Sequence, residues 1–318
     1  MSILTLTLNP ALDLSTNVDR IEPGHKLRCG PAQYDAGGGG INVSRAIMKL
    51  GGQSKALAAV GGTTGAMLQS LLQDEGIDAE WFELNGLTRQ SFVANEHVSG
   101  KQFRFVLPGP AWTERDASAF LNFLEKMLTD AGSAIRFLVV SGSTPPGVPD
   151  NYHQQIAAVA NRFGIRLALD TSGNALQRAA LQNHYPPHIW VMDHDEATQL
   201  AEHPLPNLAA LEAFAVELRS QNHANIIVLS LPEGGAVAVS DEKPISVMPP
   251  KVEVVSKVGA GDSFMAGLTM QYSSGKSLFE ACAFAVAAAA SAVTTPATEL
   301  CSGEQTQSFF KMILDRQG

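Results

Sequence analysis

The sequence lacks the features typical of secreted, zinc-ribbon and membrane proteins. Its 318 residues include three cysteines, an odd number at widely separated positions, which supports neither a disulfide framework nor a zinc ribbon. The longest apolar stretch runs from Ala281 to Val293, is mostly alanine, and is too short to span a bilayer. No basic residue precedes Arg20, so the charged start of a signal peptide is missing. We therefore expect a soluble cytoplasmic protein with no membrane partner.

Positive charge is also scarce. The chain has 22 Lys and Arg against 31 Asp and Glu, a formal net charge of −9, and it has no long basic run. This balance argues against a nucleic-acid partner. Charged residues make up only 17% of the chain and hydrophobic residues 45%, so it can bury a substantial core and is not a disordered chain. The length predicts one large domain or two modest ones.

Short apolar runs alternate with helical patterns along most of the chain. This alternation predicts an α/β fold with a parallel sheet and helices on both of its faces. From Gly261 onward the pattern predicts three consecutive helices. The expected buried strands are Ile3–Leu8, Arg136–Val140, Arg166–Asp170, Ile189–Met192 and Ile226–Ser230. The expected helices between them are Ala66–Asp74, Asn151–Phe163, Ala175–Gln182, Asp195–His203 and Asn207–Ser220.

Two stretches interrupt this alternation. Residues 11–35 are polar and rich in Pro and Gly. Residues 89–108 alternate like exposed antiparallel strands on either side of a Val-Ser-Gly-Lys turn. The pattern alone is compatible with a small sheet that projects from the core and with two ordinary surface excursions.

A run of four glycines from Gly37 to Gly40 precedes a probable helix that continues toward Leu50. Glycines let the backbone approach a ligand closely, and free N–H groups at the start of a helix attract anions. The alternative is a flexible turn. The run begins some 30 residues after the first strand, too late for a dinucleotide-binding fingerprint. An NAD-dependent dehydrogenase is therefore disfavoured.

A second motif, from Lys257 to Gly267, places Asp262 in the first turn of another probable helix. Backbone N–H groups at such a turn form an anion hole, which the helix dipole reinforces. A carboxylate beside this hole could accept a proton from a hydroxyl during phosphoryl transfer. Alternatively, Asp262 is an ordinary helix cap.

Both motifs are similar to signatures of one family. Residues 37–42 (Gly-Gly-Gly-Gly-Ile-Asn) and 258–263 (Val-Gly-Ala-Gly-Asp-Ser) resemble the two signatures of PfkB-type, ribokinase-like sugar kinases, in the branch that acts on phosphosugars. The resemblance extends over nearly the whole chain. Further matches are Thr-Leu-Asn-Pro-Ala-Leu-Asp ending at Asp13, Lys26-Leu-Arg28, Thr88-Arg-Gln90, and Ser-Gly-Ser-Thr-Pro-Pro-Gly at 141–147.

The resemblance implies a ribokinase-like, doubly wound, mostly parallel sheet with helices on both faces and a small β-sheet lid. Residues 1–10, 36–88 and 109–318 would then form the core that binds nucleotide and sugar. Residues 11–35 and 89–108 would form the lid, which in this family commonly serves as the surface of a homodimer.

The resemblance also assigns roles to individual residues. Asp262 would be the catalytic base, with Gly259, Ala260 and Gly261 forming the anion hole. The sugar hydroxyls would be held by Asp13, Gly37, Gly38 and Asn42. A phosphate already on the sugar would be held by Lys26, Arg28, Arg89 and Ser143, which suits its affinity for guanidinium and ammonium donors.

The nucleotide side both follows and departs from the family pattern. Glu196 is the expected partner of Mg²⁺ through water, and Val293–Thr298 would line the adenine. The family's usual Lys and Asn are replaced by Val191 and Asp193, and Pro232 removes a backbone N–H donor after Ser230. The remaining residues expected at the nucleotide are Asp193, Ser230, Gly235 and Val258.

The resemblance thus implies an ATP- and Mg²⁺-dependent kinase of a ketohexose phosphate, first of all fructose 6-phosphate. Tagatose 6-phosphate and fructose 1-phosphate are the alternative substrates. The departures at Val191, Asp193 and Pro232 leave open a second class, a sugar-phosphate-binding protein that has lost catalysis.

Overall fold

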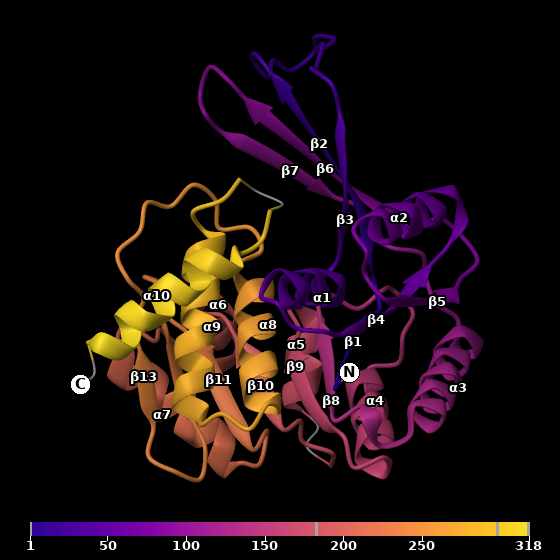
Figure 1. Ribbon diagram of the computed structural model, residues 1–318. Coiled ribbons are helices and arrows are strands. Elements are labelled where there is room, and N and C mark those ends of the chain that lie inside the picture. The colour runs from indigo at the N-terminus through magenta and orange to yellow at the C-terminus, as the bar shows by residue number, and fades with distance from the viewer. Residues whose placement is uncertain (1, 182–183, 297–298, 317–318) are drawn as a thin grey trace.

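A nine-stranded sheet forms the centre of the molecule (Figure 1). The computed structural model describes residues 2–181, 184–296 and 299–316. The strand order is β13-β12-β11-β10-β9-β8-β1-β4-β5, and neighbouring strands from β11 to β5 are parallel, whereas β12 and β13 are antiparallel. The strands are β1 (Ile3–Thr7), β4 (Lys55–Val60), β5 (Ala79–Glu83), β8 (Phe137–Ser141), β9 (Arg166–Asp170), β10 (Ile189–Met192), β11 (Ile226–Ser230), β12 (Ala236–Val239) and β13 (Ile245–Val247).

The first strand, β1, is an interior strand of this sheet, and the chain extends the sheet first on one side of β1 and then on the other. β4 and β5 lie beyond β1 on one side, and β8 to β11 lie on the other. The strand order therefore reverses between β1 and β8. In open α/β sheets, ligands bind at such a reversal, beyond the carboxyl ends of the strands. The fold alone thus places the candidate site at the ends of β1 and β8.

Helices cover both faces of the sheet because its strands are apolar on both sides. All five residues of β1 are buried, as are all five of β8. One face packs against α3 to α7, and the other against α1, α8, α9 and α10. None of the helices in the described ranges is long and apolar enough to cross a membrane. The helices are α1 (Gly39–Lys49), α2 (Gly62–Asp74), α3 (Glu114–Ala131), α4 (Tyr152–Arg162), α5 (Asn174–Ala180), α6 (His194–Ala201), α7 (Leu208–Ser220), α8 (Ala260–Ser273), α9 (Leu278–Ala292) and α10 (Gly303–Asp315).

This architecture confirms the predicted α/β fold with its doubly wound, mostly parallel sheet. The predicted strands and helices agree with the structure to within a few residues at their ends. The end of the predicted helix Ala175–Gln182 lies outside the described residues. The structure adds β4, β5, β12, β13 and α3 to the predicted elements.

A second sheet projects from the core, as Figure 1 shows at the top of the molecule. It consists of β2 (Ala11–Val18), β3 (Gln33–Gly37), β6 (Arg89–Glu96) and β7 (Gln102–Val106), in the order β3-β2-β6-β7. The two interrupting stretches therefore form one sheet and are not separate surface excursions. The last two residues of β3, Ala36 and Gly37, lie in the range that was predicted to belong to the core. The division into core and lid otherwise stays a prediction.

The two faces of this small sheet differ in character. One cross-strand row consists of Tyr34, Leu14, Phe92 and Phe105, one residue from each strand. Tyr34 is 38% exposed and Phe105 54%, and the rings of Phe92 and Phe105 stack. Since side chains alternate along a strand, Asp13 and Ser91 belong to the opposite, polar face. The lid thus has one polar face and one apolar face.

Candidate active site

The glycine run brings the start of α1 against the ends of the strands. Gly38 precedes the helix with a φ of 119°, a conformation that favours glycine. A Cβ on Gly37 would lie 2.2 Å from Oδ2 of Asp13, and one on Gly40 would lie 2.3 Å from the carbonyl oxygen of Leu6. The run is therefore a tightly packed helix start and not a flexible turn.

The second motif forms the start of α8. Gly259 precedes the helix in the left-handed region, with a φ of 77°. The first helical hydrogen bond that follows joins the N–H of Ser263 to the carbonyl of Gly259. The N–H of Ala260 donates to the carbonyl of Lys257 at 3.4 Å, whereas by helix geometry the N–H groups of Gly261 and Asp262 have no intrahelical acceptor. A Cβ on Gly261 would meet no atom within 4 Å, so the space beside this turn is open. Free N–H groups at the start of a helix attract anions, so this turn can hold one.

Asp262 is not the cap of α8, because Gly259 holds that position and α8 has no side-chain cap. Its Oδ2 accepts a hydrogen bond of 2.9 Å from Nδ2 of Asn42. Burial, and to a smaller extent the charge of Asp170, raises the pKa of Asp262 to about 7, against the hydrogen bond from Asn42. A carboxylate with this pKa is suited to accept and release a proton near neutral pH.

The sugar-side residues meet at the base of the lid. Arg89, the first residue of β6, donates from Nε to the carbonyl of Asn9 at 3.1 Å. The side-chain Nδ2 of Asn9 donates to Oγ of Ser143, also at 3.1 Å. Asn9 therefore joins Arg89 to Ser143, although 134 residues separate it from Ser143. Asn9 lies in the Thr-Leu-Asn-Pro-Ala-Leu-Asp motif, but the motif implies no role for it, because a sequence motif does not reveal contacts between distant loops.

Asp13 faces the same region from β2. Burial raises its pKa, while a hydrogen bond with Ser91 and the charges of Arg89 and Arg104 act in the opposite direction. Its charge also acts on Asp262, so the two carboxyl groups lie at one site. Arg104, on β7, is a further cation near Asp13 that was not among the predicted site residues.

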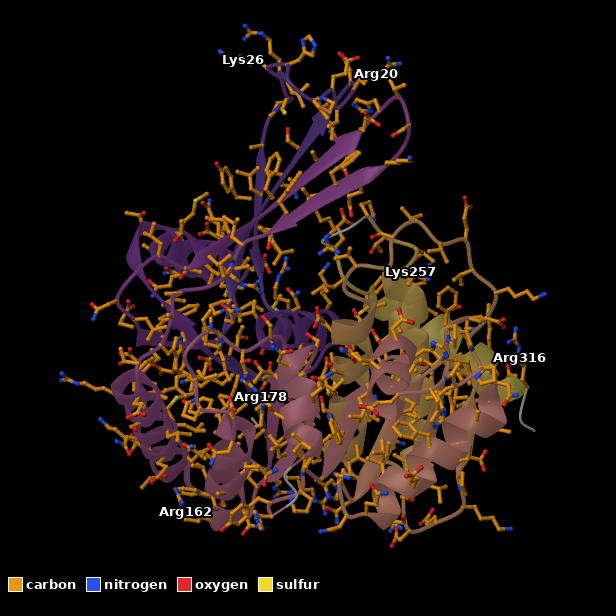
Figure 2. The ribbon with its side chains drawn as sticks, turned by 180° about the vertical axis from the view of Figure 1, so that it is seen from behind. Arg20, Lys26, Arg162, Arg178, Lys257 and Arg316 are labelled. Atoms are coloured by element: carbon orange, nitrogen blue, oxygen red, sulfur yellow. The ribbon has the colours of Figure 1, made fainter. Side chains whose placement is uncertain are left out.

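Lys26 and Arg28 lie apart from this cluster. Both are exposed in the loop between β2 and β3. Figure 2 shows Lys26 at the outer tip of the lid, pointing away from the core. Within one chain, the structure therefore brings together Arg89 and Ser143 but not Lys26 and Arg28.

On the nucleotide side, Asp193 and Glu196 form a reciprocal cap at the start of α6. Oδ1 of Asp193 accepts from the N–H of Glu196 at 2.8 Å, and Oε2 of Glu196 accepts from the N–H of Asp193 at 2.9 Å. Burial raises the pKa of Glu196 to about 7, with further contributions from the charges of Asp193 and Asp170. Burial likewise raises the pKa of Asp170 to about 6. This edge of the sheet therefore has a surplus of negative charge.

The remaining nucleotide-side positions surround the ends of β10 and β11 and the start of α8. Val191 is 7% exposed and packs in the core, so it presents no polar group. Pro232 occupies the second position of a turn in which the N–H of Gly234 donates to the carbonyl of Leu231. Ser230 ends β11, and Gly235 has a φ of 88°. Val258 directly precedes Gly259. Two residues of the expected adenine segment, 297 and 298, lie outside the described part of the chain.

A lid over a half-buried carboxylate and a helix N-terminus, at the strand reversal of an α/β sheet, is the arrangement expected of an enzyme that transfers a phosphoryl group to a hydroxyl. The family model described as pfkB family carbohydrate kinase matches residues 7–305. The chain belongs to this family, as the resemblance implied.

Curated relatives and solved structures agree with this assignment. The chain is 38% identical to ATP-dependent 6-phosphofructokinase isozyme 2 of Escherichia coli (strain K12), over 97% of each chain. It is also 38% identical to the isozyme 2 enzyme of Mycobacterium tuberculosis, over 98% of this chain and 89% of the relative. The crystal structure of phosphofructokinase-2 from Escherichia coli with substrates and products superposes with a TM-score of 0.88 at 37% identity, covering 99% of this chain and 100% of the other.

Proposed function

We propose that this carbohydrate kinase uses ATP to phosphorylate fructose 6-phosphate on its free primary hydroxyl, giving fructose 1,6-bisphosphate. The observation that carries the proposal is the position of Asp262 in the first turn of α8, where the N–H groups of residues 261 and 262 have no intrahelical acceptor. Arg89 and Ser143 support a substrate that already carries a phosphate, because their shared partner Asn9 brings them to one place and a guanidinium favours phosphate.

In this reaction, Asp13 and Asn42 bind the sugar hydroxyls, and Arg89 and Ser143 bind the existing phosphate. Asp262 accepts the proton as the hydroxyl oxygen forms a bond to the γ-phosphorus, and the bond from that phosphorus to the β-γ bridging oxygen breaks, releasing ADP. The N–H groups at the start of α8 stabilise the negative charge on the transferred phosphoryl group. The lid excludes water, which limits ATP hydrolysis.

The carboxylates near the nucleotide fit Mg²⁺ held mainly by water and phosphate. The described residues contain no group of three or more His, Cys, Asp or Glu side chains able to hold a metal alone. Mg²⁺ commonly keeps several waters and binds one or two carboxylates together with substrate phosphates. Glu196, whose pKa neighbouring negative charges help to raise, is the residue that would hold it. A bound Mg²⁺ would neutralise phosphate charge.

The lid supports a homodimer. The row of Tyr34, Leu14, Phe92 and Phe105, with its two end residues exposed and its two middle residues half-buried, is an apolar surface that a second copy of the chain would cover. Lys26 and Arg28, exposed in the β2–β3 loop, would then reach the phosphate bound by the partner subunit. We place this assembly in the cytoplasm, with sugar phosphate and nucleotide as its small-molecule partners.

The proposal is tested by measuring ADP release over a panel of fructose 6-phosphate, tagatose 6-phosphate, fructose 1-phosphate, fructose and other free sugars, each with ATP and Mg²⁺. We expect the highest kcat/KM with fructose 6-phosphate. A preference for another ketohexose phosphate would correct the substrate but keep the class. Sugar-phosphate binding without ADP release from any substrate would instead identify a non-catalytic binding protein.

A further inference from the structure

A line of polar side chains runs behind Asp262 from α8 through α1 to the end of α2. Nδ2 of Asn42 donates to Asp262, and Oδ1 of the same amide accepts from Nη1 of Arg45 at 3.4 Å. Arg45 donates from Nε and Nη2 to both carboxylate oxygens of Glu75, at 2.6 and 2.8 Å. Each donor in this line therefore meets an acceptor.

Arg45 is unusually placed for a cation. It is 7% exposed and lies one helical turn after Asn42 on α1. Burying a guanidinium costs free energy unless it is paired and hydrogen-bonded. Glu75 satisfies two of its N–H groups, and Nη1 also donates to the carbonyl of Ala36 on β3, at 3.2 Å. The guanidinium is thus fixed from three elements.

Fixing Arg45 decides how the amide of Asn42 is oriented. An amide can exchange the positions of its oxygen and its nitrogen. In the reversed orientation, the oxygen would face the carboxylate of Asp262, and the NH₂ group would face the N–H donors of Arg45. Both contacts would be repulsive. Arg45 therefore selects the orientation in which Asn42 donates to Asp262.

The charges around Asp262 give Arg45 a second effect. The negative charges that act on Asp262 are those of Asp170, at the end of β9, and Asp13, on β2. Arg45, on α1, is the positive charge that opposes them. Glu75 lies behind Arg45 and partly offsets it.

We propose that Arg45, anchored by Glu75, is a positioning residue for the base: it orients the Asn42 amide toward Asp262 and supplies the positive charge that favours the ionised carboxylate. This inference rests on the proposed role of Asp262 as the base. It predicts that Arg45 and Glu75 have opposite effects on the pH dependence of the reaction.

The experiment is the pH dependence of kcat/KM for fructose 6-phosphate in Arg45→Met, Glu75→Gln and the wild type. Arg45→Met removes the cation, so the acid limb should move to higher pH by about 0.5 to 1 unit. Glu75→Gln keeps the guanidinium but removes its counter-charge, so the limb should move to lower pH. The titration of the substrate phosphate is common to all the enzymes and cancels in this comparison.

Arg162→Met is the matched control, because it removes a surface ion pair with Glu125 between α4 and α3. It should leave the limb in place. If Arg45→Met does not fold, the double variant Arg45→Met/Glu75→Gln leaves no unpaired buried charge and should show a smaller upward shift. Unmoved limbs in the Arg45 and Glu75 variants, with Asp262→Asn inactive, would overturn the inference alone. An active Asp262→Asn would overturn the proposed base as well.

Discussion

Asp262 is held in a setting that makes its negative charge costly. It is half-buried at the start of α8, and burial together with the charge of Asp170 raises its pKa to about 7. The helix N-terminus and Asn42 act in the other direction. A carboxyl group in such a balance is about half ionised at neutral pH, so it can both accept a proton and hold it. The ionised Asp262 therefore lowers the free energy of unfolding, and the same raised pKa makes its carboxylate a better proton acceptor.

Replacing Asp262 by Asn should separate these two effects. We expect kcat to fall by at least about 10²-fold with little change in KM, because the base is lost while the contact with Asn42 is kept. The wild-type kcat/KM should rise with pH up to about 7, since the carboxyl must lose its proton to act. Kinetics at pH 5 to 9 test both expectations. A near-normal kcat would exclude Asp262 as the base.

Asp262→Asn should also change stability with a defined sign. Because the folded-state pKa of Asp262 is raised, its stabilising contribution is present below the unfolded value near 4 and is lost as the pH rises through about 7. The variant should therefore unfold at higher denaturant concentration than the wild type at pH 8, and the difference should disappear toward pH 4. Asp241→Asn, at an exposed bend, is the control and should show no such gain.

Asp193 has two roles that one substitution can separate. Its side chain caps α6, and its charge adds to the surplus around Glu196. Asn caps a helix about as well as Asp, so Asp193→Asn should keep stability while lowering KM for ATP or relaxing its Mg²⁺ dependence. Asp193→Ala should have the same effect on ATP but lose about 1 kcal/mol of stability. Weaker use of ATP by Asp193→Asn would show instead that the carboxylate takes part in metal binding.

At the scale of elements, the strand β6 joins the lid to the core and begins at Arg89, a candidate phosphate-binding residue. Arg89 begins this strand and is held by the carbonyl of Asn9, just before the chain enters the lid at β2. The proposed phosphate-binding group therefore lies where two lid strands leave the core. Arrival of a phosphate at Arg89 can in this way be linked to movement of the lid.

Arg89→Ala should reduce kcat/KM for fructose 6-phosphate by about 10- to 150-fold, since a charge-assisted contact is worth about 1.5–3 kcal/mol. Free fructose has no phosphate to lose, so its kcat/KM should barely change. Arg89→Lys keeps the charge without the fork and should fall in between. Equal losses for both sugars would mean that Arg89 serves the structure of the lid and would weaken the phosphosugar assignment.

The elements also show what the sequence could and could not reveal. Strands such as β8 and β9 are predictable because each contains a short apolar run, Phe-Leu-Val-Val in β8 and Leu-Ala-Leu in β9. α3 carries comparable sequence signals of a helix, with a cap from Thr113 and apolar residues three or four apart, but it contains no motif and was not predicted. The parallel pairing of β2 with β6 could not be predicted, because these strands are distant in the sequence and local patterns do not specify their partners.

The motifs predict individual site residues, but they do not predict the hydrogen bonds between those residues. Asp262 and Asn42 were both candidates, but their hydrogen bond joins residues 220 positions apart. Arg45 lies within the first motif, and its pairing with Glu75 depends on how α1 packs beside the end of α2. Motifs identify side chains that chemistry needs, whereas the supporting contacts arise only from the packing of the whole chain.

At the scale of the whole molecule, the apolar face of the lid is the surface on which the proposed dimer depends. Phe105 is 54% exposed and belongs to the apolar row that crosses all four strands. Phe105→Glu would place a charge in that row, so we expect a dimeric wild type and a monomeric variant in analytical ultracentrifugation. Glu114→Gln, at the exposed start of α3, is the control and should stay dimeric. A wild type that remains monomeric at micromolar concentration would exclude the lid dimer.

The dimer also predicts that active sites are shared between subunits. Lys26 points away from its own core, so it would serve the site of the partner (Figure 2). Lys26→Ala and Asp262→Asn should each be impaired alone. In a mixed dimer, the subunit with an intact Asp262 receives an intact Lys26 from its partner. Half of the dimers are mixed and have one complete site of two, so mixing after subunit exchange should restore about a quarter of wild-type activity.

If Lys26 served its own chain, no mixed dimer would contain a complete site, and mixing would restore nothing. Adding Phe105→Glu to both chains should abolish the recovery, because the recovery requires the lid interface.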